Sequence, residues 1–208
     1  MFRPNYAQDA PPEAIRVGGA SYPVNVDFRT WIDVLDLARE LYPTVGTLLE
    51  ARHNARVLEN MQRLAFDRVL EAPPAAVLRA MTAFARGYPT MVGEEAGGDG
   101  EGEELLSFDY DINDLVLAIE EQFGLDLSYR RAEPFHWWEF LLRVRALCGD
   151  HAILRAVRLR ASRDTSREAR LARRRARLPH KPTAEERRQL EALRAAAGDG
   201  EKGEKHAH

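Results

Sequence analysis

Apolar residues recur at helical spacing along most of the chain, which predicts a mainly α-helical protein. The clearest stripe lies between Asp111 and Gly124, where apolar side chains occupy positions i, i+3, i+4, i+7 and i+11: Ile112, Leu115, Val116, Ile119 and Phe123. Asp111 is placed to cap this helix, and Gly124 is placed to end it in the left-handed conformation. A second helix is predicted over residues 134–148. It is apolar around most of its circumference, which is typical of a central core helix.

The tryptophan pair in the second helix allows two interpretations. Trp137 and Trp138 either pack mainly in the core, or at least one of them lines a groove for a partner, because aromatic side chains dominate the anchors of protein interfaces. Cys148 lies on the apolar stripe of the same helix, so we expect its thiol to be buried and unreactive.

The N-terminal part of the chain predicts a small β-hairpin followed by helices. Residues 15–17 and 21–26 flank the pair Gly18-Gly19, and paired glycines allow the positive φ angles that tight hairpin turns require. Asp27 then caps a predicted helix that ends at Pro43.

Two more helices are predicted before residue 92. Residues 44–70 are helical in character, with a candidate break at His53-Asn54 and these candidate core positions: Val45, Leu48, Leu49, Leu58, Met61, Ala65 and Val69. The next helix begins at Pro73-Pro74 and ends at Gly87, with four side chains facing inward: Val77, Ala80, Met81 and Phe84.

These elements divide the chain into a core domain and extensions. We expect an irregular lead over residues 1–13, and a core domain formed by residues 14–92 and 107–161. A flexible linker rich in glycine and glutamate separates the two core segments at residues 93–106. An Arg-rich helical extension follows at residues 162–197, where Thr183 and Glu186 form a capping box, and a disordered tail at residues 198–208.

Charge is unevenly distributed although the net charge is only −3. Nine acidic residues and no Lys or Arg lie between Glu94 and Asp114, whereas twelve arginines and three acids lie between Arg143 and Arg177. The arginine block is either a solvated helical face or a contact surface for an acidic partner or nucleic acid, because guanidinium groups bind carboxylates and phosphates alike. The block has no interleaved aromatic residues and no DNA-binding motif, which argues against nucleic acid.

No motif in the chain is arranged for catalysis. The sequence has no glycine-rich phosphate loop, no nucleophile elbow and no paired cysteines for zinc, so we expect no enzyme activity, no cofactor and no metal site. The single cysteine excludes an intramolecular disulfide, as in a reducing compartment. No apolar run approaches the ~20 residues that span a bilayer, and the N-terminus lacks the apolar core of a signal peptide. These features predict a cytoplasmic protein.

An ordered set of short blocks is similar to one family. Residues 22–31 (YPVNVDFRTW), 108–111 (FDYD), 122–127 (QFGLDL) and 136–140 (HWWEF) together resemble the bacteriophage gene-product-fifteen family of long-tailed phages and prophages. The resemblance spans roughly residues 12 to 178, and the Ala/Arg/Glu-rich C-terminal extension departs from the lysine-rich ending that is usual in the family.

The resemblance implies a mainly helical tail-assembly chaperone of the host cytoplasm. Such a chaperone would bind the tape-measure protein, tail-tube subunits or both during tail assembly, with self-association as a further interaction, and would be absent from the mature virion. The alternatives are an Arg-rich adaptor that binds nucleic acid and a structural tail component that stays in the virion. We name eight candidate partner-binding residues. Five lie in the hairpin, in the first helix and at its end, and at the start of the 134–148 helix: Tyr22, Trp31, Tyr42, His136 and Trp137. The other three are arginines of the C-terminal block: Arg170, Arg173 and Arg174.

Overall fold

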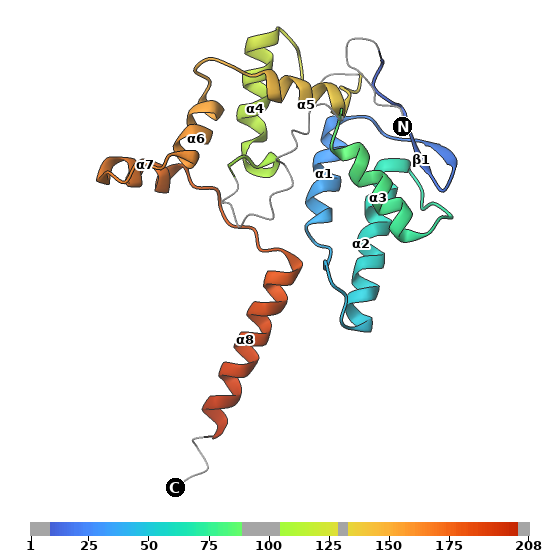
Figure 1. Cartoon of the computed structure of the whole chain (residues 1–208), viewed down its shortest axis with the longest axis vertical. Coiled ribbons are helices and arrows are strands. Elements are labelled where there is room, and N and C mark those ends of the chain that lie inside the picture. The colour runs from blue at the N-terminus through green and yellow to red at the C-terminus, as the bar shows by residue number, and fades with distance from the viewer. Residues whose placement is uncertain (1–8, 89–104, 129–132, 204–208) are drawn as a thin grey trace.

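The computed structural model describes residues 9–88, 105–128 and 133–203, with side chains as far as residue 194 (Figure 1). These residues form eight α-helices and one two-stranded antiparallel sheet, which confirms the predicted mainly helical fold with an N-terminal hairpin. Most of the expected lead and nearly all of the expected acidic linker lie outside the described residues. None of the described helices is long and apolar enough to cross a membrane.

The hairpin forms where the paired glycines predict it. Strand β1 (Ala14–Val17) pairs with β2 (Ala20–Pro23), and the turn between them has φ angles of 58° at Gly18 and 91° at Gly19. Both values lie in the left-handed region that glycine adopts without strain. Ile15 and Val17 are buried, so β1 contributes one face to the core.

Helices α1 (Phe28–Ala38) and α2 (Leu48–Phe66) each begin with a side-chain cap. The Asp27 carboxylate accepts a 2.9 Å hydrogen bond from the backbone N–H of Arg29, as predicted. Thr47 and Glu50 form a capping box at the start of α2. The candidate break at His53-Asn54 is wrong, because both side chains bond to the backbone of the preceding loop instead of to α2. Asn54 donates to the carbonyl of Tyr42 and accepts from its N–H, both at 2.9 Å.

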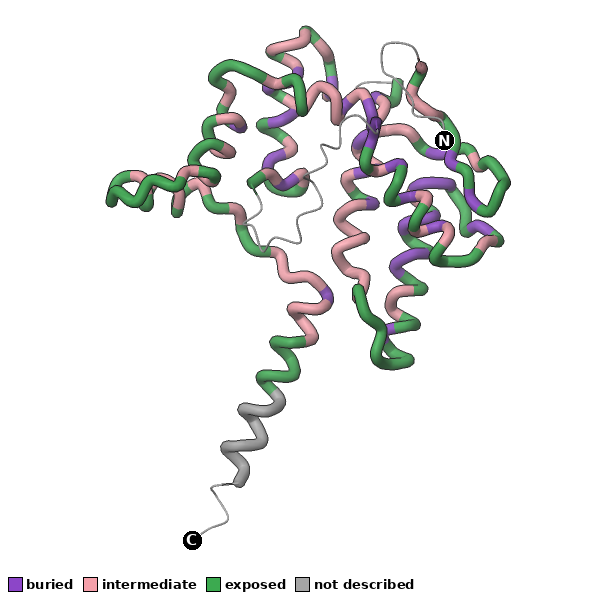
Figure 2. Tube along the Cα trace, in the orientation of Figure 1, coloured by how far each residue is buried: buried purple, intermediate pink, exposed green. Residues whose placement is uncertain are grey.

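The first turn of α2 is more exposed than its sequence predicts. Leu58, Met61 and Ala65 are buried as expected, and so are Val57 and Phe66. The other candidate core positions, Val45, Leu48, Leu49 and Val69, are exposed. For Val45, Leu48 and Leu49 the reason is geometric: α1 ends at Ala38, so the turn before α2 and its first residues extend beyond the packed core, where Figure 2 shows an exposed loop. Val69 lies after the end of α2 at Phe66, off the apolar stripe of the helix.

Helix α3 (Pro74–Ala85) matches the prediction, with three of its apolar side chains fully packed: Val77, Met81 and Phe84. Helix α4 (Phe108–Phe123) begins one turn earlier than predicted, so Asp111 is not its cap. The Asp111 carboxylate instead accepts a 3.0 Å hydrogen bond from the N–H of Ser107, the residue before the helix. Gly124 ends α4 at φ 66°, as predicted.

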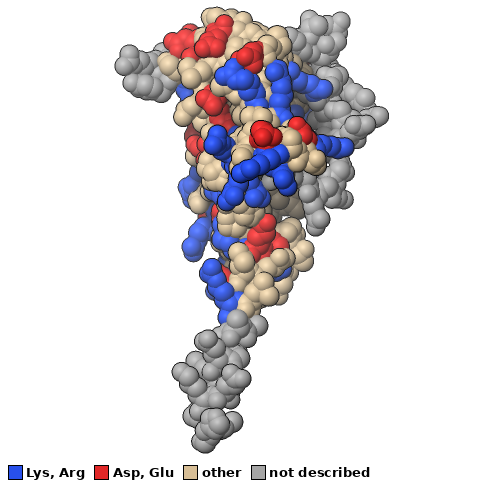
Figure 3. Space-filling model, turned by 90° about the vertical axis from the view of Figure 1, so that its left-hand side faces the viewer, with Lys and Arg blue, Asp and Glu red and all other residues tan. Residues whose placement is uncertain are grey.

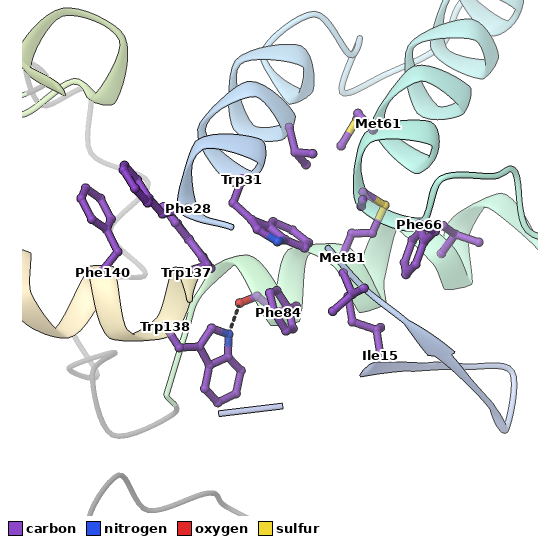
Figure 4. Close-up of a cluster of buried hydrophobic side chains, with 14 of the residues drawn as sticks. Ile15, Phe28, Trp31, Met61, Phe66, Met81, Phe84, Trp137, Trp138 and Phe140 are labelled. Atoms are coloured by element: carbon purple, nitrogen blue, oxygen red, sulfur yellow. Dashed lines mark hydrogen bonds between the residues drawn. The ribbon is translucent and has the colours of Figure 1, made fainter. Parts of the chain in front are cut away.

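Helix α5 (Trp137–Ala146) contributes Trp137, Trp138 and Phe140 to the core, beside aromatic side chains of α1 and α3 (Figure 4). Its start differs from the expected position at residue 134 because His136 is its cap: Nδ1 accepts a 3.0 Å bond from the N–H of Trp138. Phe28 of α1 stacks on Phe140 at 4.4 Å between ring centroids. The Trp137 indole donates to the carbonyl of Ala85 at 2.9 Å. The core interpretation of both tryptophans is confirmed, since Trp137 and Trp138 are buried.

The C-terminal helices are progressively less packed. Helix α6 (Ala152–Ala161) rests on α4 through a small cluster of Leu115, Ala118 and Ile153. Helix α7 (Arg167–Ala176) has no buried residue, and α8 (Ala184–Gly203) projects away from the body (Figure 1). Helix α8 passes the predicted end near Ala197, so residues 198–203 are helical and not disordered as expected. The run of alanines before Gly198 favours this continuation.

Cys148 follows α5 and is exposed, so the prediction of a buried thiol is wrong. The helix ends at Ala146, and Leu147 has an extended backbone (φ −60°, ψ 131°), which takes Cys148 off the apolar stripe.

Candidate partner-binding surfaces

The five residues predicted as partner anchors do not form one surface. Trp31 and Trp137 are completely buried, so they belong to the core and cannot meet a partner in this fold. Burial leaves neither indole N–H unsatisfied, because each donates to a backbone carbonyl: Trp31 to Asn25 at 2.7 Å and Trp137 to Ala85.

The other three of these residues are half-buried and pack against different neighbours. Tyr22 on β2 lies under the guanidinium of Arg68, and Tyr42 meets the ring of His53 edge-on at 5.3 Å. His136 serves the fold: Nδ1 caps α5, and Nε2 lies 3.1 Å from the carbonyl of Pro12. Burial lowers the pKa of His136, which favours the neutral form of its ring.

An apolar groove of about 560 Å³ runs between α1 and α4. Its walls are side chains of the two helices and the segment after α4: Phe28, Ile32, Ile112, Val116, Leu117 and Leu127. Leu117 is 54% exposed, which is unusual for a leucine beside a core. Arg29, Asp33 and Asn113 supply the polar rim. The sequence placed Ile112 and Val116 on the inner stripe of the helix but gave no sign that a groove would open beside them.

One end of this groove is held in place by Arg29. Its Nη2 donates to two consecutive carbonyls, that of Leu127 at 3.1 Å and that of Ser128 at 2.8 Å. These bonds tie the first turn of α1 to the segment that follows α4. The groove is therefore a preformed feature and not a gap between independent helices.

A second pocket, of about 500 Å³, is lined mainly by cations and lies where α6, α7 and the start of α8 meet the end of α1. Arg170, Arg173 and Arg174 all line it, so the structure brings the three predicted arginines together. Four further cations that the sequence did not single out as site residues also line it: Arg39, Arg160, Arg177 and Lys181. Figure 3 shows Lys and Arg gathered at the centre of the face that carries α7.

Some of these cations are neutralised within the protein. Arg160 binds the Asp111 carboxylate through both Nη atoms, and the Lys181 ammonium binds Asp36 and lies 3.4 Å from Asp109. Arg173 donates to the backbone carbonyls of Ser162 and Asp164. The carboxylate partners of Arg160 and Lys181 come from α1 and α4, which explains why sequence spacing could not indicate the pocket.

Arg170 and Arg174 differ from these, because neither guanidinium has a hydrogen-bond or ion-pair partner within the part of the chain that the structure describes. Glu186 is the one carboxylate among the lining residues, and it is engaged by Thr183 in the capping box that the sequence predicted. The hydrogen bond from the N–H of Thr183, followed by that from its hydroxyl, lowers the pKa of Glu186.

The start of α8 is fixed to the body by charge pairs. Arg187 pairs with Glu40, and Arg188 pairs with Glu50 at 3.0 Å, while Ala184 is completely buried. Farther along α8, Leu190 and Leu193 are exposed. Over residues 9–88, 105–128 and 133–203, no group of three or more His, Cys, Asp or Glu side chains is placed to hold a metal ion.

The family model described as Bacteriophage Gp15 protein matches residues 8–196 of the chain. The chain belongs to this family. It is therefore a phage-related protein. Comparison with curated proteins and with solved structures gives no match.

Three of the four blocks that carry the family resemblance meet at one place in this Gp15 chain. Asp27 forms an isolated antiparallel bridge with His136, Phe28 stacks on Phe140, and Phe108 meets Trp137 edge-on at 5.6 Å. These residues build the junction between the two halves of the core. The resemblance therefore reports the packing of the fold, and the exposed grooves and pockets must be judged by their own geometry.

Proposed function

We propose that this phage protein is a tail-assembly chaperone that binds an amphipathic helical segment of the tape-measure protein in the groove between α1 and α4. The groove is the observation that carries the proposal, because it offers an apolar, preformed surface on a protein of the Bacteriophage Gp15 family. The protein acts in the host cytoplasm before the tail is complete, and it leaves the assembly before the virion matures.

The groove has the chemistry that a helical ligand requires. An amphipathic helix binds by laying apolar side chains spaced at i, i+3, i+4 and i+7 into an apolar channel. Ile112 and Val116, one turn apart on α4, face Phe28 and Ile32 of α1 across the channel. Arg29 and Asp33 on the rim offer polar groups of opposite charge to the polar edge of such a helix.

Covering an apolar stripe is useful to a partner that is long and helical. A tape-measure protein without its tube exposes apolar stripes, and exposed apolar surface drives aggregation. A chaperone lowers the concentration of the aggregating species by mass action and is displaced when tail-tube subunits polymerise around the partner. This role needs no catalytic residue, cofactor or metal.

The test is co-expression of the tape-measure protein with wild-type chaperone or with Leu117→Glu, followed by measurement of soluble tape-measure protein. Leu117 is exposed in the groove, so the glutamate places a charge in the channel without opening the core. Leu49→Glu is the matched control, because Leu49 is exposed on α2 outside the groove. We expect wild type and Leu49→Glu to raise the soluble yield and Leu117→Glu to lose most of that gain.

Two outcomes would contradict the proposal. One is a tape-measure protein that stays equally insoluble with the wild-type chaperone. The other is detection of the protein by mass spectrometry at stoichiometric levels in purified mature tails, which would favour a retained structural component.

A further inference from the structure

The arginine-lined pocket is concave and has an excess of positively charged side chains. Arg170 and Arg174 occupy positions i and i+4 on one face of α7, and Arg177 follows the last residue of the helix; all three line the pocket. Six arginines and one lysine line it against one glutamate. Arg160 and Lys181 are paired with carboxylates outside the lining, but Arg170 and Arg174 have no ion-pair partner in the described part of the chain, so the lining keeps an excess of positive charge that attracts anionic groups.

An apolar stripe begins at the edge of this pocket. Glu186 lines the pocket, and Leu190 and Leu193 follow it at i+4 and i+7, so the three residues share one face of α8. Leu190 is 47% and Leu193 is 67% exposed. The opposite side of α8 is occupied, because Ala184 and Arg187 contact the turn that follows α1 and Arg188 contacts α2. Leu190 and Leu193 therefore form an exposed apolar strip on α8 that begins at the edge of the pocket and points away from the body.

We propose that the arginine pocket and the Leu190–Leu193 strip together bind an acidic amphipathic helix of a protein partner. The acidic end of that helix would enter the pocket, where guanidinium groups form paired hydrogen bonds with carboxylates. Its apolar side chains would lie along α8. The site is separate from the α1–α4 groove, and its occupant is recognised by charge as well as by apolar contact.

A protein segment fits this surface better than nucleic acid. Phosphate backbones need cations but no apolar strip, whereas the strip is continuous with the pocket. Single-stranded nucleic acid binds by stacking its bases on aromatic side chains. No tryptophan, tyrosine or phenylalanine lines the pocket. A concave pocket of about 500 Å³ also matches a few side chains more closely than the extended face of a duplex.

The test uses a fluorescein-labelled synthetic peptide with glutamates in its first turn and leucines at i, i+4 and i+7 of the following turns. Anisotropy titrations at about 0.15 M ionic strength measure its affinity for the full chain, because exposed pairs are then screened beyond about 8 Å. Arg170→Glu/Arg174→Glu should weaken binding by about tenfold or more, equivalent to the loss of at least one charge-assisted contact. Leu190→Ser/Leu193→Ser should weaken it by about tenfold or more, as expected when two half-exposed leucines lose their burial against the peptide.

Matched controls separate the site from general charge and from folding. Arg163→Glu/Arg175→Glu makes the same change in net charge at exposed positions outside the pocket, and Leu171→Ser removes a leucine on α7 that is as exposed as Leu190. Both should keep the wild-type affinity to within about twofold, since neither removes a contact of the site. All variants should retain the wild-type denaturation midpoint, because the substituted side chains are exposed.

Three outcomes would overturn the inference. Equal losses in the pocket pair and the Arg163/Arg175 pair would show attraction to net charge alone. If a peptide with its leucines replaced by serine bound equally well, the Leu190–Leu193 strip would not be part of the binding site. Tighter binding of a labelled DNA duplex, abolished by the pocket pair, would assign the pocket to nucleic acid. Leu117→Glu should leave peptide binding unchanged, so failure here and failure of the proposed chaperone function are distinguishable.

Discussion

Asp111 and Arg160 form a buried bidentate ion pair that fastens the end of α6 to the first turn of α4. The distances are 2.6 Å between Nη1 and Oδ2 and 2.9 Å between Nη2 and Oδ1. The side chain of Arg160 is 10% exposed and that of Asp111 is 6% exposed. Arg160 also donates to the carbonyls of Leu105 and Ala176, so one side chain joins three segments beside the arginine pocket.

Replacing Arg160 with alanine should destabilise the fold by about 3–5 kcal/mol, because removing one partner leaves the other charge buried without compensation. Urea denaturation measures the loss. Arg155→Ala on the same helix is the control: its pair with Asp150 is exposed on both sides, and exposed pairs contribute about 0–1 kcal/mol. Equal losses in the two variants would contradict the assignment of Arg160 as a structural anchor.

Core truncations should separate two aromatic residues that look alike in the sequence. Trp137→Ala should cost about 3–5 kcal/mol, through lost burial and a cavity, because its ring is 1% exposed. Phe123→Ala should cost less, about 1–2 kcal/mol, because Phe123 is only half-buried at the end of α4. Denaturant midpoints give the comparison. A larger loss at Phe123 than at Trp137 would be inconsistent with this core.

Stability should fall as the pH drops below about 6.5, the pKa of histidine in an unfolded chain, because burial lowers the pKa of His136 in the folded state. Above that pH both states are neutral at this site. Below it the unfolded state binds the proton more readily, so unfolding is favoured by up to about 1.4 kcal/mol per pH unit until the folded-state pKa is reached. Protonation of Nδ1 would also remove the cap of α5.

His136→Asn isolates this effect, because asparagine caps a helix but does not titrate. The free energies of unfolding of wild type and variant should be compared at neutral pH and at lower pH by urea denaturation. The five other histidines contribute equally to both proteins. A difference between wild type and variant that does not change with pH would refute the assignment.

Gly124→Ala should destabilise the protein by about 1–2 kcal/mol, the cost of a left-handed conformation for an L-residue. The φ angle of Gly124 is +66°, and an added Cβ meets no atom within 4 Å, so the loss comes from the backbone and not from a clash. Gly46→Ala is the control, because its Cβ would make an ordinary contact at 3.5 Å with Glu50. Thermal denaturation should show a loss for Gly124 alone.

Local signals in the sequence predicted several elements correctly. The Gly18-Gly19 turn, the Asp27 cap, the end of α4 at Gly124 and the Thr183–Glu186 capping box all depend on residues close in sequence, and all are present. In each case the backbone conformation is set by neighbouring residues.

Features that depend on residues far apart in sequence were missed. Asp111 was predicted to be a helix cap because it stands just before an apolar stripe. Its actual role, an ion pair with Arg160, joins residues 49 positions apart and could not be inferred from local spacing. His53 and Asn54 looked like a helix break because their bonds to the preceding loop were not visible. Trp31 and Trp137 were predicted to be partner anchors, but the packing of α5 on α1 buries both side chains in the core. The arginine pocket was half predicted: its α7 residues were named, and its lining from α1, α6 and the start of α8 was not.

The anchoring of α8 also determines when the arginine pocket is completed during synthesis of the chain. The hairpin, α1, α2 and α3 lie within the first 88 residues, whereas Lys181, Thr183 and Glu186 of the pocket are translated late. Lys181 reaches back to Asp36 across 145 residues, and such long-range contacts form slowly and after local structure. A ribosome-bound chain therefore presents the α1 wall of the apolar groove long before it presents a finished arginine pocket. A partner that meets the growing chain would therefore encounter the α1 wall of the groove first and the arginine pocket later.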